Sequence, residues 1–214
     1  TPIIEPTHLW LDRLKYQGKI GTTAKGIGPA YSSFYARDSI LFKDFVNDFH
    51  ESYLKIIDNM EDFLDNNNKI FSFNEETYLS LLDDYKVMDR EILECVDIVK
   101  PFLSDNDNYM QECYSKGKNI LLEGAQGWGL NIMSREYPNV TSSMPTVGGA
   151  INSTGLSHKQ IDEVIGVTKV YKTKVGTGDF PSRCSSDDEA VLAKIGNEFG
   201  ATTGRPRKCG WLDI

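Results

Sequence analysis

The sequence predicts an α/β protein in which a mostly parallel sheet carries a helical insertion over about residues 40–115. Two observations support this fold class. Apolar residues recur at helical spacing over residues 41–64 and 74–99, as in long amphipathic helices. After residue 116 the chain changes to short β-prone runs separated by glycine loops. Because α/β proteins bind ligands at the carboxyl ends of parallel strands, we expect nucleotide-binding loops there.

The first twenty residues contain one short helical pattern. Residues 7–14 are predicted to form a helix that turns Leu9, Trp10 and Leu14 inward. A glycine-bearing loop is predicted next, over residues 20–31.

The helical insertion is predicted to consist of two helices. Residues 41–64 read as one continuous amphipathic helix, which the polar run DNNNK at residues 65–69 interrupts. A second helix is predicted over residues 74–99. Pro101 and the DNDN run at residues 105–108 mark its end.

The last hundred residues are predicted to alternate strands and loops. Residues 119–123 are predicted to form a buried strand that leads into the loop GAQG, and residues 164–171 a second strand. Residues 186–199 are predicted to form a connecting helix. We therefore expect one domain over 1–214, with a helical subregion at 40–115 and a strand and loop subregion at 116–214.

The composition and charge of the chain argue against some classes of protein. The net charge of -8 over 214 residues argues against a nucleic-acid binder, because such a protein needs a dominant basic surface. No apolar run is long enough for a membrane span, and the start has no secretory leader. The four cysteines lie far apart, which favours a reducing, cytoplasmic setting. The chain begins without methionine and stops at WLDI, so we expect both ends to be cuts.

The sequence GATTGRPRKCGWLD at residues 200–213 combines hydroxyls, glycines and cations in one stretch. Arg205 and Arg207 each carry a planar guanidinium that matches a carboxylate or a phosphate. Lys208 adds a point charge, and Thr202 and Thr203 add hydroxyl donors. We call residues 200–208 the cationic segment and predict that it binds anions; a basic surface turn is the alternative.

Three further positions carry polar groups suited to a nucleotide. The run GTTAKGIG at residues 21–28 can form a nest of backbone N–H groups for a phosphate, although it lacks the Walker A spacing, and an ordinary glycine turn is the alternative. Gln126 both donates and accepts hydrogen bonds, as the edge of a purine requires, or bonds only within its own loop. Thr141 begins a hydroxyl-rich turn. His8, His50 and His158 lie outside these motifs and show no metal-ligand spacing.

Four motifs in order resemble the adenylosuccinate synthetase family. They are IGTTAKGIGPAY at residues 20–31, EGAQG at 123–127, YPNVTSS at 137–143 followed by Gly148 and Gly149, and the stretch at 200–213. The resemblance runs from about residue 20 to the end of the chain. It implies the family reaction, in which GTP drives the ligation of L-aspartate to inosine monophosphate (IMP) to give adenylosuccinate, GDP and phosphate, the first committed step from IMP to AMP.

The resemblance also implies roles for individual residues. The residues matched to IMP contacts are Thr23, Arg37, Gln126, Thr141, Val175 and Arg205, with Arg37 reaching the neighbouring site of a homodimer. The residues matched to aspartate contacts are Ala201, Thr202, Thr203, Gly204, Arg205, Pro206 and Arg207, and Arg207 also matches a GTP contact. The chain departs from the family at Phe34, where lysine is usual, and at Asp179 and Pro206.

Family members place the general base, the catalytic histidine and the phosphate loop in a preceding region, and the guanine-reading segment in a following one. The resemblance thus assigns no catalytic residue and no metal ligand within this chain, expects GTP and Mg²⁺ to serve the whole enzyme, and predicts a partial domain that is inactive alone. Two alternatives are a related viral synthetase that acts on 2′-deoxyguanylate and a non-catalytic nucleotide-binding module.

Overall fold

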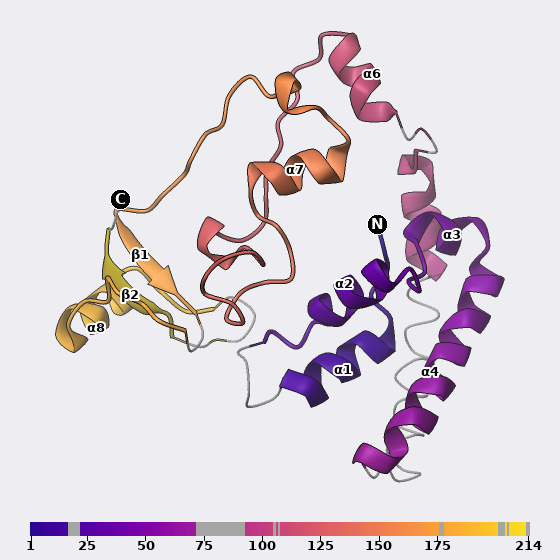
Figure 1. Ribbon diagram of the computed structural model, residues 1–214, viewed down its shortest axis with the longest axis horizontal. Helices are drawn as coiled ribbons and strands as arrows, with labels where there is room; N and C mark the ends of the chain where they lie inside the picture. Colours follow the sequence, from indigo (N-terminus) through magenta and orange to yellow (C-terminus); the bar gives the residue numbers. More distant parts are fainter. Residues whose placement is uncertain are drawn as a thin grey trace. The chain divides into compact units, whose positions relative to one another are not determined.

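A computed structural model describes residues 1–16, 22–71, 93–104, 106, 108–175, 178–200, 204 and 206–212. The chain divides into two compact units, Thr1–Leu14 with Lys25–Asp107 and Lys15–Ala24 with Asn108–Ile214. Each unit is described by itself, and its elements can be followed in Figure 1. The single domain over 1–214, with its two subregions, stays a prediction.

The first unit is helical in its described residues. Its elements are α1 (Pro6–Tyr16), α2 (Ile27–Ala36), α3 (Phe42–Asn47), α4 (Phe49–Phe71), a helix at residues 93–99 and the short η1 (Lys100–Phe102). The predicted helix at 7–14 is confirmed within α1. The helix at 93–99 ends ahead of Pro101, as predicted, because proline clashes with the preceding turn of an α-helix. Residues 72–92 of the second predicted helix lie outside the described residues.

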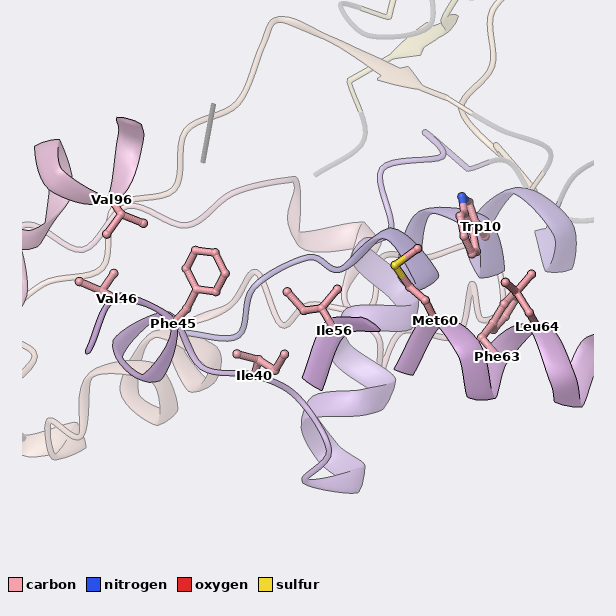
Figure 2. Packing of buried hydrophobic residues seen from close by; sticks show 9 residues of the cluster. All are labelled: Trp10, Ile40, Phe45, Val46, Ile56, Met60, Phe63, Leu64 and Val96. Atoms are coloured by element: carbon pink, nitrogen blue, oxygen red, sulfur yellow. The ribbon is translucent and has the colours of Figure 1, made fainter. Parts of the chain in front are cut away.

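One face of α4 forms the centre of the apolar core of this unit. Ile56, Met60, Phe63 and Leu64 lie at helical spacing on that face and are all buried. Trp10 of α1 packs against Phe63 with 5.7 Å between ring centroids. Figure 2 shows the whole buried cluster, which comprises Trp10, Ile40, Phe45, Val46, Ile56, Met60, Phe63, Leu64 and Val96. Leu9 and Leu14 are partly buried against it, so the inward face predicted for α1 is confirmed.

The prediction of one continuous helix over 41–64 was wrong. The chain breaks at Asp48, whose backbone N–H donates to the Asp44 carbonyl (2.8 Å) and closes α3. The Asp48 carboxylate accepts from the Glu51 N–H (3.0 Å), as an N-cap does, and so begins α4. The helix also continues through the polar run at 65–69 to Phe71. Asparagine is only a weak helix former, costing at most about 0.7 kcal/mol per residue, so this run does not stop the helix.

The predicted loop at 20–31 is shorter than expected, because α2 begins at Ile27. Gly26 precedes it in the left-handed conformation (φ 73°), which glycine adopts without steric cost. Pro29 lies in the first helical turn, where a missing N–H breaks no intrahelical bond. Local turn chemistry therefore starts a helix inside the glycine motif.

The second unit combines short helices with a small sheet. Its elements are α6 (Tyr109–Ser115), η2 (Trp128–Leu130), α7 (Val147–Thr154), η3 (His158–Gln160), β1 (Tyr171–Lys174), α8 (Ser186–Ile195) and β2 (Lys208–Trp211). The prediction of a helix from residue 186 is confirmed, although α8 ends at Ile195. Ser185 caps it by accepting from the Asp188 N–H (3.2 Å), and three acidic residues occupy its first turn, where the helix dipole favours them.

In the described residues the sheet has two antiparallel strands, β1 and β2, with Tyr171 opposite Trp211 and Lys174 opposite Lys208. α8 packs against β2 (Figure 1). The predicted strand at 119–123 has no regular structure, and that at 164–171 contributes only Tyr171 to β1. A strand forms only where a neighbour pairs its backbone, and the described residues offer these two segments none; Leu121 is 87% exposed and Val167 94%. The mostly parallel sheet stays a prediction.

Within the described parts of both units, every helix is too short or too polar to cross a membrane.

Candidate functional site

The base of the cationic segment is a closed hairpin in the second unit. Phe199 pairs with Pro206 across an antiparallel bridge, and the Arg207 N–H donates to the Glu198 carbonyl (2.9 Å). The Gly204 N–H donates to the Gly200 carbonyl (2.7 Å), and Gly204 has φ 62°, a conformation that favours glycine. Of the residues predicted to bind aspartate, Gly204, Pro206 and Arg207 lie here; Ala201, Thr202, Thr203 and Arg205 lie outside the described residues.

Glu198 is buried directly beneath this hairpin, with 5% of its side chain exposed. Its Oε1 accepts from Lys169 Nζ (2.7 Å) and Tyr171 Oη (2.5 Å), and its Oε2 from Arg207 Nη1 (2.9 Å). Burial by itself raises the pKa of a carboxyl group, but the hydrogen bonds from these three donors outweigh it and lower the pKa of Glu198 to about 2. The same contact with Glu198 raises the pKa of Tyr171. Glu198 is therefore ionised at neutral pH and holds Arg207.

A second polar cluster joins two of the predicted IMP-binding residues. Ser143 Oγ lies 3.1 Å from Gln126 Oε1 and 3.3 Å from Thr141 Oγ1. Backbone bonds connect the two loops, since the Thr141 N–H donates to the Leu130 carbonyl (2.9 Å). Gln126 has φ 65°, a left-handed conformation that costs a non-glycine residue about 1 kcal/mol or more. The fold therefore gathers Gln126 and Thr141 around one hydroxyl.

The glycine pair that follows this cluster is explained by packing. A Cβ placed on Gly149 would overlap the carbonyl oxygen of Met144. The first turn of α7 approaches the preceding loop closely, and Thr146 caps it through Gly149 N–H at 3.5 Å. Gly149 thus lets α7 approach this loop closely, whereas a Cβ on Gly148 would meet only Thr146 Oγ1, at 3.8 Å.

Two backbone N–H groups of the glycine loop are already bonded within the chain. The Gly26 N–H donates to the buried Asp12 Oδ2 (2.8 Å), and the Ala24 N–H donates to Thr22 Oγ1 (3.1 Å). Thr23, matched to the IMP phosphate, is exposed. Two of the N–H groups counted toward the nest are therefore committed within the chain, and the exposed side chain of Thr23 is a further donor that could meet a phosphate.

Arg37 lies at the C-terminal end of α2 in the first unit. It caps the helix with φ 69°, and its N–H donates to the Phe34 carbonyl (3.1 Å). Its side chain is exposed, as are Phe34 and Tyr35, whose rings meet edge to face at 5.9 Å. The Phe34 that replaces the family's usual lysine therefore adds to an exposed aromatic surface beside Arg37.

Val175, matched to the IMP ribose, follows β1 directly and is 46% exposed. The neighbouring Lys174 Nζ bonds to Glu136 Oε2 (3.0 Å) and to the Asp179 carbonyl (2.6 Å). Because the chain uses the backbone of Asp179 here, the replacement of the usual proline leaves this contact in place.

The sequence reasoning missed Glu198 and Ser143, which hold predicted site residues. Ser143 was visible as the third hydroxyl of its motif. Glu198 had a weaker signal, a lone acid two residues before a segment with three cations. Where residues are described, no group of three or more His, Cys, Asp or Glu side chains is placed to hold a metal ion.

Comparisons with known proteins agree with these motifs. The sequence model of the family described as adenylosuccinate synthetase matches residues 1–214. The chain is 41% identical over 216 residues to adenylosuccinate synthetase of Pelodictyon phaeoclathratiforme, covering 99% of this chain and 48% of that protein. It is 38% identical over 218 residues to that of Halothermothrix orenii, covering 99% of this chain and 49% of that protein.

A solved structure, fully ligated adenylosuccinate synthetase from Plasmodium falciparum, is similar with a TM-score of 0.75 and 34% identity, over 100% of this chain and 49% of that one. That neighbour has an α/β nucleotide-binding fold. The chain spans about half the length of the curated relatives that it matches. Because the family match extends over all its residues, the chain belongs to the adenylosuccinate synthetase family.

Proposed function

We propose that the protein containing this chain is a GTP-dependent C–N ligase of purine biosynthesis that joins L-aspartate to IMP. The observation that carries the proposal is the family match over residues 1–214, which includes the cationic segment. In the reaction, the γ-phosphoryl group of GTP passes to O6 of IMP, leaving GDP. The amine of aspartate then attacks C6, and phosphate leaves with the O6 oxygen. Phosphorylation converts a poor leaving group into a good one.

The described geometry supports the role proposed for Arg207. Its guanidinium carries five N–H donors, of which Nη1 reaches Glu198, and a third of the side chain is exposed. A fork held at one edge can still present donors to an anion, here the carboxylates of aspartate and the phosphates of GTP. Arg205, Thr202 and Thr203 are proposed to complete the aspartate contacts, with Arg205 also near the ribose of IMP.

The cluster around Ser143 supports an IMP site. Gln126 is proposed to face the base near O6, and Thr141 to contact the 5′-phosphate together with Thr23. Ser143 orients the side-chain oxygens of Gln126 and Thr141, which lie within 3.3 Å of its hydroxyl. Val175 is proposed to pack on the ribose. We also propose that a mostly parallel sheet brings these loops together.

The remaining parts of the proposal concern the whole protein. Mg²⁺, when bound with GTP, would neutralise charge on the transferred phosphate. The residues matched here supply binding contacts and neither the general base nor the catalytic histidine, so residues 1–214 alone are proposed to be inactive. We propose a cytoplasmic homodimer in which Arg37 reaches the partner's site, since Arg37 and the aromatic pair Phe34 and Tyr35 are exposed on one helix end.

The test is aspartate-dependent consumption of IMP by the full-length polypeptide with GTP and Mg²⁺, with 2′-deoxyguanylate tried in parallel. Formation of adenylosuccinate and GDP in equal amounts is expected. Turnover of 2′-deoxyguanylate alone would assign the protein to the other substrate class. Tight nucleotide binding without any aspartate-dependent turnover would leave only a nucleotide-binding module.

A further inference from the structure

The buried Glu198 receives hydrogen bonds from three parts of the second unit. Lys169 precedes β1, Tyr171 opens β1, and Arg207 immediately precedes β2. The two carboxylate oxygens are divided between them, since Oε1 accepts from Lys169 and Tyr171 and Oε2 accepts from Arg207. The carboxylate therefore links Lys169 and Tyr171, at the start of β1, to Arg207 in the cationic segment.

Arg207 is fixed at two points by the same residue. Its backbone N–H donates to the Glu198 carbonyl (2.9 Å), and its Nη1 donates to the Glu198 carboxylate (2.9 Å). With the bridge between Phe199 and Pro206, these bonds set both the position of the Arg207 backbone and one edge of its guanidinium. A planar guanidinium held at one edge has a fixed orientation, so its other donors point in a defined direction.

The charges around Glu198 make this arrangement sensitive to loss of the carboxylate. The Glu198 side chain is 5% exposed, whereas Lys169 is 45% and Arg207 33% exposed. One buried negative charge thus lies between two partly exposed positive ones. Without it, Lys169 and Arg207 repel each other and three donors lose their acceptor, which costs far more than the loss of an exposed ion pair.

We propose that Glu198 is a positioning residue, which orients the guanidinium of Arg207 so that this side chain meets its anionic ligands in one fixed geometry. This rests on the proposed function, in which Arg207 contacts aspartate and GTP. Glu198 itself touches neither ligand. It acts by removing the rotational freedom that Arg207 would otherwise lose on binding.

The kinetic test uses the full-length enzyme and the variant Glu198→Gln, which keeps the size of the side chain but loses its charge. We expect the KM values for aspartate and GTP to rise about tenfold or more, as for loss of a charge-assisted hydrogen bond. The KM for IMP and kcat should change less than about threefold, because Arg207 is not assigned to IMP and the group is lost from binding rather than from the chemistry.

The matched control is Glu189→Gln. Glu189 forms a bidentate pair with Arg183 in the same unit (2.7 and 3.1 Å), so the variant also loses an arginine–carboxylate pair, but one outside the base of the cationic segment. It should leave all three KM values unchanged. KM values for aspartate and GTP that match wild type in Glu198→Gln, or a fall in kcat alone, would overturn the proposal.

A second measurement needs no turnover. Trypsin cuts poorly between Arg205 and Pro206, so the sites left in this segment are the bonds after Arg207 and after Lys208, and mass spectrometry of the fragments distinguishes the two. We expect cleavage after Arg207 to be about tenfold faster in Glu198→Gln than in wild type or Glu189→Gln, because the clamp on Arg207 is released. Unchanged cleavage overturns the positioning role, whatever the catalytic result.

The two measurements separate the two proposals. If the wild-type protein does not convert IMP but Glu198→Gln is still cleaved faster than wild type, the proposed function is refuted and the clamp on Arg207 is supported. Should Glu198→Gln not fold, Glu198→Asp takes its place in both measurements. It keeps the charge but is one methylene too short to reach both sets of partners, and the same unchanged KM values or cleavage rate would overturn the proposal.

Discussion

Replacing Gly26 by alanine tests whether this glycine of the loop is needed for folding or for ligand binding. Gly26 has φ 73°, where an L-residue with a Cβ pays about 1 kcal/mol. A Cβ there would lie 3.0 Å from Ile4 Cγ2 and 3.1 Å from both His8 C and His8 Cβ. Ile4 is 40% exposed and can move, but His8 is buried in α1, so the tight contact adds about 1–2 kcal/mol. We expect Gly26→Ala to destabilise the first unit by about 2–3 kcal/mol.

The assay is hydrogen exchange of the amides in α1 and α2 of the full-length protein, which reports local opening. A loss of about 2–3 kcal/mol lowers their protection roughly 30-fold or more. Gly155→Ala and Gly117→Ala are the controls, because these glycines have φ 69° and 64° with nothing within 4 Å of a built Cβ. They should lose about 1 kcal/mol in their own segments.

A loss in Gly26→Ala equal to that in the two controls would refute the packing explanation. The variant should also bind IMP with unchanged affinity under conditions where it is folded, because the Gly26 N–H is already bonded to Asp12 at 2.8 Å. A large loss of IMP affinity in the folded variant would instead show that the backbone at Gly26 meets the phosphate.

Three further predictions concern the first unit. Met60→Ala should lower the free energy of unfolding by about 2–5 kcal/mol in urea, since Met60 is 1% exposed, whereas Met60→Leu should cost under about 1.5 kcal/mol; equal losses would refute this. Burial lowers the pKa of His8 below its ordinary 6.5 despite the nearby Glu5. The neutral ring therefore contributes its full stability above pH 6.5, and this contribution is lost as the pH falls below that value. An NMR titration should give a pKa under 6.5, and a higher value would contradict the burial. Asp48→Ala should cost about 1 kcal/mol through loss of the cap on α4, as measured by thermal unfolding, with Asp48→Asn close to wild type; no difference between the two would count against the cap.

The buried polar network of α1 explains why His8 should be neutral. Its Nδ1 accepts from the Glu5 N–H (3.1 Å), so the proton lies on Nε2, which donates to Ser33 Oγ (2.9 Å). Ser33 in turn donates to the Pro29 carbonyl (3.2 Å). Protonation of Nδ1 would remove the acceptor of a buried N–H. The contact with Ser33 of α2, 25 residues away, could not be read from the local sequence around His8.

Elements with a local signal were predicted well. The inward face of α1 followed from the spacing of Leu9, Trp10 and Leu14, and the start of α8 from the apolar residues that follow Ser185. The break at Asp48 was missed although its chemistry is local, because the apolar spacing on both sides suggested one helix. The strands were predicted less well, because β-propensity does not say whether a neighbouring strand exists to pair with.

In the candidate site, too, some features could be predicted from the sequence and others could not. Motif order was enough to indicate the family, and the comparisons confirmed it. The sequence also predicted ligand-binding roles for Gln126 and Thr141, but that Ser143 joins them followed only from the folded loops. The binding roles given to all the matched residues, Gln126 and Thr141 included, stay predictions.

By itself the sequence determined the family, the helical stripes around Met60 and the residue types of the cationic segment, since these depend on spacing and chemistry along a short stretch of chain. Only the tertiary structure decided that the Gly26 N–H is used by Asp12 and that Glu198 holds Lys169 and Arg207. Glu198 and Lys169 are 29 residues apart, and hydrogen-bond partners this distant are selected by the folded backbone rather than by any local pattern.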